Sequence, residues 1–237
     1  MRPLLTMTLL LALGCGARPI PGVVERRPGE TLTHIPGPMP NLGSFQTYSD
    51  ALLAACPKIL SLPHAVASHP SDFNFELRWR LSKEYCAWIY YTPDGLYEMS
   101  MLTTRPFQDD PRRRQCDLPS FVRDSRYADD SLGYVFVVHN HPVGNEPSRD
   151  DIRFIVNQGS IHGFVVKTHE REVPLGIVAY FARTDQDRPT CAGFFLYMPV
   201  TGEILKWTTD ENGEWKKKHY GKVTWKNASD FDVERLP

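Results

Sequence analysis

Short apolar runs in the middle of the chain predict the strands of a sheet. The clearest run, residues 133–138, is apolar, β-branched and aromatic, and it ends at His139. Runs of this length between turn residues are typical of buried strands. The same pattern predicts further strands at about 85–91, 96–103, 163–168 and 175–182.

Two helices are predicted from capping residues. Ser148 is placed to cap a helix near 149–158, and Asp151 then falls at the third helical position. The stretch from Ser49 to Cys56 predicts a second capped helix, with Pro57 marking its end or a kink. Residues 72–83 fit either a helix or an alternating strand, and the pattern leaves both open.

Strands with helices packed on them predict an α/β (α+β) fold, in which a mixed sheet is flanked by helices around one core. We assign this domain to residues 46–185. Residues 186–237 predict a C-terminal β extension, because strands at 194–199 and 203–207 flank a turn. The aromatic side chains of the extension are expected to pack it onto the domain, the alternative being a face that binds peptide or sugar.

The N-terminus indicates export. Arg2, the apolar stretch Leu4 to Leu13 and then Cys15 resemble a bacterial lipoprotein signal with its lipobox, covering residues 1–15. This resemblance implies that a lipidated Cys15 anchors the protein to a membrane of the cell envelope, with the outer membrane favoured by Gly16. An ordinary secretory signal or a short buried helix is the alternative. The proline- and glycine-rich residues 16–45 predict an extended tether.

The net charge and the cysteine content limit which classes of binding partner and which disulfide pairings are expected. The formal charge is -1, and removal of residues 1–14 takes Arg2 away and makes it -2. A chain so nearly neutral is not expected to bind nucleic acid. The basic runs 112–114 and 216–218 are expected to be solvated. Once Cys15 is assigned to lipid, the other cysteines permit two disulfides in any of three pairings. These cysteines are Cys56, Cys86, Cys116 and Cys191.

The residues that follow the central strand point to a metal site. Alternation along a strand places His139 and His141 on the same side, and Asp151 in the first turn of the next helix faces back toward them. Two imidazoles and one carboxylate can hold zinc and leave one position open for water. Asp150 is the alternative carboxylate, but the spacing from Ser148 favours Asp151.

Hydrolysis at such a site also needs a group that moves a proton. Glu84, which opens the predicted strand 85–91, is the candidate for this role. Glu98 is the rival, although we expect its strand to turn that polar face to water. Among the remaining histidines His162 is the best spare, because it comes soon after the predicted helix.

These motifs together resemble the JAMM motif of the JAB/MPN metalloprotease superfamily, and residues 139–144 are especially similar to its RadC-type and other prokaryotic branches. The resemblance covers about residues 82–180. It implies a cytidine-deaminase-like architecture, with zinc held by His139, His141 and Asp151. It also implies that Glu84 is the general acid/base and that Ser148 donates to the tetrahedral oxyanion. Nine residues (142 to 150) separate His141 from Asp151, one fewer than in the commonest form of the motif.

The resemblance implies a JAMM-type zinc metallopeptidase or isopeptidase, which cleaves an amide bond of a peptide or protein by attack of a zinc-activated water molecule. One alternative is a catalytically silent MPN-like scaffold, and another is a cell-wall hydrolase acting on a peptide cross-link. The insertion at 104–130, which carries Asp109 and Asp110, is expected to form a surface loop near the site. The sequence names no substrate and no oligomeric state.

Overall fold

The computed structural model describes residues 19–26, 29–105, 113–143, 146–183, 190–210 and 212–236. The predicted signal segment with Cys15, and Asp109 and Asp110 of the insertion, lie outside the described residues. In the part of the chain that is described, no helix is long and apolar enough to cross a membrane.

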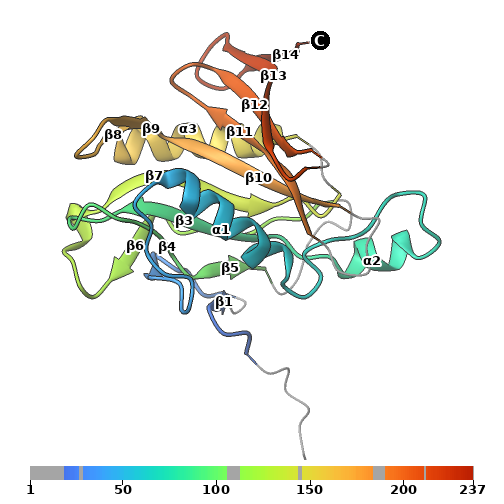
Figure 1. Ribbon diagram of the computed structural model, residues 1–237, viewed down its shortest axis with the longest axis horizontal. Helices are drawn as coiled ribbons and strands as arrows, with labels where there is room; N and C mark the ends of the chain where they lie inside the picture. Colours follow the sequence, from blue (N-terminus) through green and yellow to red (C-terminus); the bar gives the residue numbers. More distant parts are fainter. Residues whose placement is uncertain are drawn as a thin grey trace, which may run out of the picture.

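A mixed sheet of ten strands, counted over the described residues, forms the centre of the molecule (Figure 1). Its order is β1-β5-β3-β7-β10-β11-β12-β13-β14, with β4 paired to β3. The strands β7 and β10 are parallel, and β10 to β14 continue as an antiparallel series. The bounds of the ten strands are β1 Val23–Glu25, β3 Tyr85–Tyr91, β4 Tyr97–Met99, β5 Leu102–Thr104, β7 Gly133–Asn140, β10 Gly176–Arg183, β11 Thr190–Met198, β12 Glu203–Thr209, β13 Trp215–Trp225 and β14 Phe231–Arg235.

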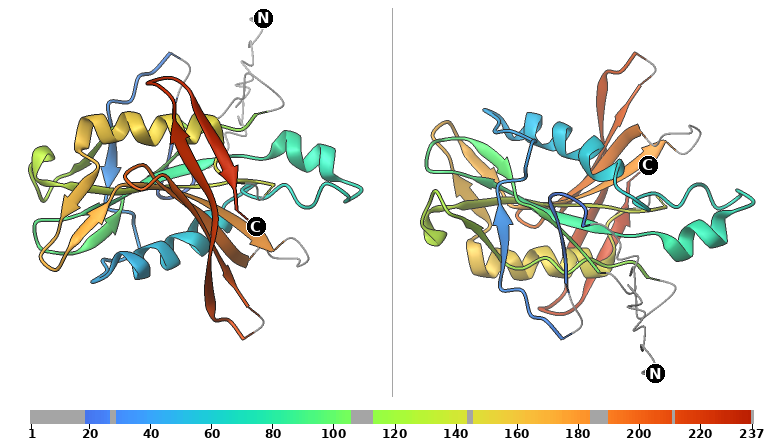
Figure 2. Two further views of the ribbon diagram at one scale, coloured as in Figure 1. Left: turned by 90° about the horizontal axis from the view of Figure 1, so that it is seen from above. Right: turned by 90° about the horizontal axis from the view of Figure 1, so that it is seen from below.

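Two helices cover opposite faces of this sheet, as Figure 2 shows. Helix α1 (Tyr48–Leu60) packs on one face, where alternate residues of β3, β7 and β10 form a core with it. Helix α3 (Arg149–His162) packs on the other face through Ile152 and Ile155. The predicted fold class, a mixed sheet flanked by helices, is therefore confirmed.

The remaining elements are short. Helix α2 (Phe75–Leu81) settles the open prediction for residues 72–83 in favour of a helix. A parallel pair joins β2 (His34–Gly37) to β6 (Phe121–Asp124), and an antiparallel pair joins β8 (Val165–Lys167) to β9 (Glu172–Pro174). A 3-10 turn, Asp129–Ser131, precedes β7.

Several predicted strands are confirmed and others need correction. The strands predicted at 85–91, 133–139 and 175–182 are β3, β7 and β10. The strand predicted at 96–103 is two strands, because Ser100 interrupts it: its backbone N–H and its hydroxyl oxygen bond the backbone of Trp88. The strand predicted at 163–168 is shorter and lies outside the main sheet.

Helix α1 also differs from its prediction. Its N-cap is Thr47, whose hydroxyl accepts a hydrogen bond from the backbone N–H of Asp50, so the predicted start at Ser49 is one residue inside the helix. Pro57 lies within the helix, which continues to Leu60. The helix therefore does not end at Pro57.

The segment predicted as a tether is part of the fold from Val23 onward. Strand β1 pairs in parallel with β5 at one edge of the main sheet, and β2 pairs with β6. Ile35 and Met39 are buried among these elements. The prediction of an extended tether over all of residues 16–45 is therefore wrong for the described residues from Val23 onward.

The predicted C-terminal extension continues the main sheet. Strand β11 is hydrogen-bonded to β10, and β12 follows it through the predicted turn. The disulfide Cys56–Cys191 joins α1 to β11, and a second disulfide, Cys86–Cys116, joins β3 to the segment before β6. The proposed boundary at residue 186 lies outside the described residues.

Candidate metal centre

The end of β7 holds the two predicted histidines in place. His139 is the penultimate residue of β7 and His141 follows the strand, where its backbone N–H donates to the Tyr180 carbonyl of β10. Asn140 points to the opposite face, where its side-chain oxygen accepts from the Tyr85 N–H at 2.8 Å and its amide donates to the Ala65 carbonyl at 2.6 Å. With Asn140 tied to the backbone on that side, the alternation of the strand turns both imidazoles to the α3 face.

The two imidazoles and Asp151 converge. The Nε2 atoms of His139 and His141 lie 2.9 Å apart. The Asp151 carboxylate oxygens lie 3.5 Å from the His139 Nε2 and 3.3 Å from the His141 Nε2. Ligand atoms about 2.05 Å from a tetrahedral zinc ion are about 3.3 Å from one another. The spacing of these three groups therefore fits a zinc-sized ion, and the short spacer after His141 does not separate them.

Asp151 is held by the start of α3. Its backbone N–H donates to the Ser148 hydroxyl at 3.1 Å, and its carboxylate accepts from the Ser148 N–H at 2.6 Å, which together make a capping box. Asp150, the alternative ligand, faces away and forms ion pairs with Arg113 at 3.3 Å and Arg153 at 3.5 Å. The structure therefore places Asp151, and not Asp150, beside the histidines.

Ser148 has a structural role in this arrangement, since it is the N-cap of α3. The same residue lines the cavity described below together with His139 and His141. Its predicted role as a donor to an oxyanion stays a prediction.

Glu84 lies immediately before β3 and completes the group. Its Oε1 atom is 3.7 Å from the Nε2 atoms of both His139 and His141, and the three side chains form a buried group that could bind a metal ion. Burial raises the pKa of Glu84 to about 8, an effect that the neighbouring His141 opposes and that Asp151 increases. A carboxyl group with a pKa close to neutrality can both accept and return a proton.

Burial and charge act in opposite ways on the other members of the site. Burial lowers the pKa of His139 although Asp151 favours the charged ring, so the neutral form that binds metals is favoured. Burial alone would raise the pKa of Asp151, but His139 and His141 together hold it well below its usual range. Asp151 is therefore a carboxylate near neutral pH, as a metal ligand must be.

The site opens into a cavity of about 790 Å³. One wall is the segment 113–119, which the Cys86–Cys116 disulfide and a hydrogen bond from the Trp88 indole to the Pro119 carbonyl hold against β3. The insertion was predicted to lie near the site, and its described part does so, although β6 makes it more than a loop. The arginines that line the cavity are Arg26, Arg113, Arg114, Arg149 and Arg153.

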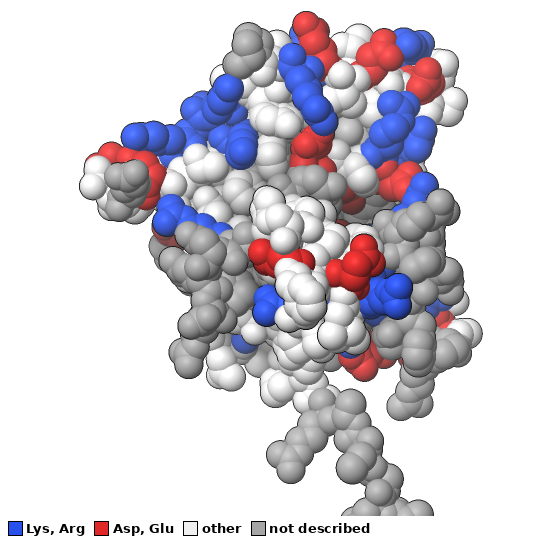
Figure 3. Space-filling model, turned by 90° about the vertical axis from the view of Figure 1, so that its right-hand side faces the viewer, with Lys and Arg blue, Asp and Glu red and all other residues white. Residues whose placement is uncertain are grey.

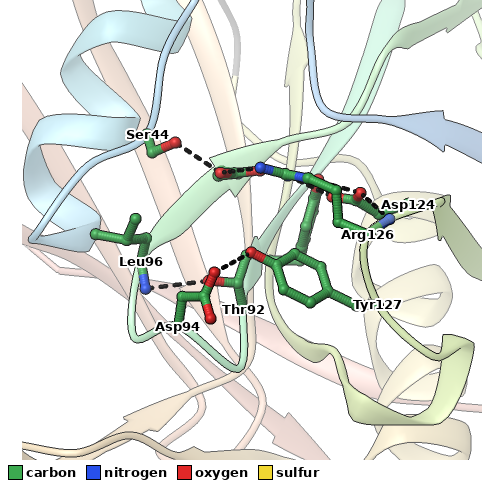
Figure 4. Close-up of polar contacts among 9 residues, drawn as sticks. Ser44, Thr92, Asp94, Leu96, Asp124, Arg126 and Tyr127 are labelled. Carbon is green, nitrogen blue, oxygen red and sulfur yellow. Dashed lines mark hydrogen bonds and ion pairs between the residues drawn. The ribbon is translucent and has the colours of Figure 1, made fainter.

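Glu98, the rival proton carrier, belongs to a separate polar network, of which Figure 4 labels Ser44, Asp124 and Arg126. It forms an ion pair with Arg126 and accepts a hydrogen bond from the Ser44 hydroxyl at 2.6 Å. Arg126 also binds Asp124, which accepts from the Tyr90 hydroxyl at 2.9 Å. Glu98 is only 1% exposed, so the expectation that its polar face meets water is wrong.

The other histidines lie elsewhere. His162, the predicted spare ligand, is at the far end of α3, where its Nε2 contacts the Ser120 carbonyl at 2.8 Å and its ring stacks on Tyr134. Of the described residues that line the cavity, the histidines are His139 and His141.

Sequence reasoning found the side chains that converge but missed two features that position them. One is Asn140, which lies inside the motif and whose side chain was not considered as an anchor. The other is the wall at 113–119, whose place depends on which cysteine pairs with Cys86. A residue flanked by two inward-facing histidines must face the other way, and this signal could have identified Asn140.

Comparisons with known proteins found no match for this chain. No protein-family model matches the sequence, no curated protein is significantly similar to it, and no solved structure matches it. The site must therefore be interpreted from its own chemistry.

Proposed function

We propose that this protein is a zinc-dependent hydrolase that cleaves an amide or isopeptide bond of a peptide or protein. The observation that carries the proposal is the convergence of the His139 and His141 Nε2 atoms and the Asp151 carboxylate within 3.5 Å, in the lining of a cavity. Two neutral imidazoles and one carboxylate form a donor set that suits zinc and leaves a coordination position open.

The metal ion, when bound, supplies Lewis acidity, which lowers the pKa of water and polarises a carbonyl group. Glu84 moves the proton: it takes one from the attacking water and returns it to the leaving nitrogen. Its place 3.7 Å from both Nε2 atoms, together with a pKa of about 8, supports this role. A group at that distance can reach a water molecule between itself and the ligands.

The Ser148 hydroxyl is proposed to donate to the oxyanion of the tetrahedral intermediate. It accepts from the Asp151 N–H, and a hydroxyl group that accepts one hydrogen bond can still donate another. The JAMM resemblance of residues 139–151, together with the position of Glu84 beside the histidines, supports the finer proposal of a JAB/MPN-like architecture.

Two disulfides in the described part of the chain support the proposal of an exported protein, because such bonds persist in oxidising compartments. The lipoprotein-like residues 1–15 lead us to propose attachment to the outer membrane through Cys15. The proposed substrate is accordingly a peptide or protein of the cell envelope or exterior.

Metal content tests the proposal. Purified full-length protein, together with its His139→Ala and Glu84→Gln variants, is analysed by mass spectrometry for bound metals. We expect about one zinc ion per chain in the wild type, none in His139→Ala, and retention in Glu84→Gln, because Glu84 serves proton transfer and does not hold the ion. Peptide, isopeptide and muropeptide substrates then identify the bond that the wild type cleaves and Glu84→Gln does not.

A wild-type protein that folds normally and binds no metal would contradict the hydrolase proposal and favour the alternative of a non-catalytic scaffold. Cleavage confined to muropeptides would instead assign the protein to cell-wall cross-links, with the same chemistry. Retention of full activity by Glu84→Gln would remove Glu84 from the mechanism.

A further inference from the structure

The lining of the cavity at the metal site carries more positive than negative charge. Over the face of the molecule in Figure 3, Lys and Arg side chains are interspersed with Asp and Glu, in keeping with the net charge of -1. Apart from the proposed metal site, the described residues that line the cavity include five arginines and two carboxylates, Asp117 and Asp150. Residues 106–112 lie outside the described ranges and contain two aspartates and one arginine, so their formal charge of -1 cannot cancel this excess.

Ion pairs with residues just outside the lining leave the excess unchanged. Asp230 pairs with Arg149 at 2.8 Å, which adds one negative charge. Arg105 pairs with Asp117 at 2.6 Å, which adds one positive charge. When zinc is bound, its two positive charges offset both carboxylates of the metal site. The cavity is therefore an environment that favours an anionic group of a ligand.

The fold ties one of the five arginines, Arg114, to the segment that carries Glu84. The Arg114 Nε donates to the hydroxyl of Ser82, two residues before Glu84, at 2.9 Å. Two residues after Glu84, the disulfide Cys86–Cys116 joins the same two segments. Two residues of chain span at most about 7 Å. Arg114 and the proposed proton carrier therefore lie on one wall of the cavity, which both of them line.

The guanidinium of Arg114 is held in one orientation. Its Cζ atom lies 4.2 Å from the centroid of the Trp79 ring. Its Nη1 donates to the Arg113 carbonyl at 2.7 Å, and its Nε donates to the Trp79 carbonyl at 3.1 Å. These carbonyls and the Ser82 hydroxyl are neutral, so these contacts orient the guanidinium without cancelling its charge. Each Nη nitrogen carries two N–H groups, and one from each can bind the two oxygens of a carboxylate.

We propose that Arg114 binds a carboxylate of the polypeptide substrate, within about four residues of the bond that is cleaved. This inference rests on the proposed function, since it assigns a substrate class to the same cavity. Four extended residues span about 14 Å, about twice the reach of the two residues that separate Ser82 from Glu84. The carboxylate belongs to an aspartate or glutamate side chain or to a free C-terminus, which share this chemistry.

Fluorescence anisotropy of labelled decapeptides tests the site in full-length, zinc-loaded Glu84→Gln protein, in which binding is measured without cleavage. One peptide has a central glutamate and an amidated C-terminus. A second has glutamine at the centre and a free C-terminus, and a third has glutamine and an amidated C-terminus. The first two peptides distinguish the two sources of a carboxylate, and the third is their neutral control.

Three further substitutions are added to this protein one at a time. Arg114→Gln removes the charge, and Arg114→Lys keeps the charge but loses the planar fork. The matched control is Arg80→Gln, which removes the same charge from an exposed residue of α2 that is not among the described residues of the cavity lining. Zinc content and melting temperature are measured for each variant. If Arg114→Gln does not fold, the comparison of Arg114→Lys with Arg80→Gln decides.

We expect at least one of the two carboxylate peptides to bind about tenfold more tightly than the neutral peptide. Arg114→Gln should remove this preference, Arg114→Lys should lower it about threefold, and Arg80→Gln should leave it within about twofold. Equal binding of the three peptides, absence of binding included, would overturn the proposal. So would a preference that survives both substitutions of Arg114, or one that Arg80→Gln weakens as much.

Removal of zinc with a chelator separates this inference from the proposed function. The preference for a carboxylate that depends on Arg114 should persist in zinc-free protein. A preference that disappears with zinc and ignores Arg114→Gln would make zinc itself the carboxylate site and overturn the proposal. A protein that binds the carboxylate peptides through Arg114 but cleaves no peptide would contradict the hydrolase and leave this site standing. Cleavage of acidic and neutral peptides with equal kcat/KM, together with equal binding, would contradict this site and leave the hydrolase standing.

Discussion

Zinc affinity can decide whether Asp151 or Asp150 is the third ligand of the proposed zinc site. Asp151→Asn removes the charge beside the two imidazoles, but an asparagine oxygen can still accept from the Ser148 N–H and keep the helix cap. Asp150→Asn is the matched control, because it removes the same charge one residue away, where the carboxylate meets Arg113 and Arg153 in solvent.

The size of the effect follows from the position of Asp151. Loss of a group that only supports a metal ligand costs about 10- to 100-fold in affinity, so loss of a ligand should cost at least about 100-fold. At saturating zinc this ratio corresponds to about 2.7 kcal/mol of lost stabilisation. In a protein of this size each kcal/mol shifts the melting temperature by about 2 to 4 °C, so zinc should raise the Tm of Asp151→Asn about 5 to 11 °C less than that of the wild type.

Thermal unfolding followed by circular dichroism, with and without zinc, measures both variants. Without zinc, Asp151→Asn should lose about 1 kcal/mol or less, the interaction of an acidic residue with a helix N-terminus. Asp150→Asn should respond to zinc as the wild type does. If Asp150→Asn loses the zinc response and Asp151→Asn keeps it, the assignment of the ligand is wrong.

Two further predictions concern Ser148 and Arg126. Ser148→Gly should keep the free energy of unfolding within a few tenths of a kcal/mol, because glycine is a good N-cap. Its kcat should nevertheless fall about 100-fold if the hydroxyl stabilises the oxyanion. Ser148→Ala should show the same fall in kcat and also lose about 1 kcal/mol of stability. A Ser148→Gly enzyme with unchanged kcat would reduce Ser148 to a cap. Arg126→Met leaves the carboxylates of Glu98 and Asp124 buried without their cation. Unfolding by guanidinium at pH 7 should therefore show a loss of about 3 kcal/mol in the free energy of unfolding. This value is the low end of the usual range, because Arg126 is 44% exposed. Arg126 holds the pKa of Asp124 below its usual value against the effect of burial, so this stabilisation is lost as the pH falls through that pKa. The difference between variant and wild type should therefore shrink below about pH 4, and a constant difference would refute the role of the ion pair.

The elements that sequence predicted well are those whose signal is local. The apolar run before His139 and the cap at Ser148 each depend on a few adjacent residues, and both are present as β7 and α3. The convergence of His139, His141 and Asp151 follows from the same strand–turn–helix unit. Glu84 immediately precedes another strand, and its position beside them depends on the pairing of β3 with β7.

The predictions that failed depended on partners distant in the chain. Strand β1 has three residues and is ordered by its parallel partner β5, about 80 residues later, so its proline- and glycine-rich surroundings pointed to a tether. Glu98 is buried because Arg126 and Ser44 reach it from other elements, which no alternation within its own strand could show. The pairing of the cysteines was open for the same reason.

Under the proposed attachment through Cys15, the pairing of β1 with β5 would also limit how far the folded domain can lie from a membrane. If Cys15 carries a lipid, seven residues (16 to 22) connect it to Val23, the first residue of that strand. At about 3.5 Å per residue this linker spans roughly 25 Å at full extension, less than the width of a bilayer. If both the proposed lipid anchor and the proposed hydrolase activity hold, so short a linker would keep the site close to the lipid surface and favour polypeptides that are themselves near that surface.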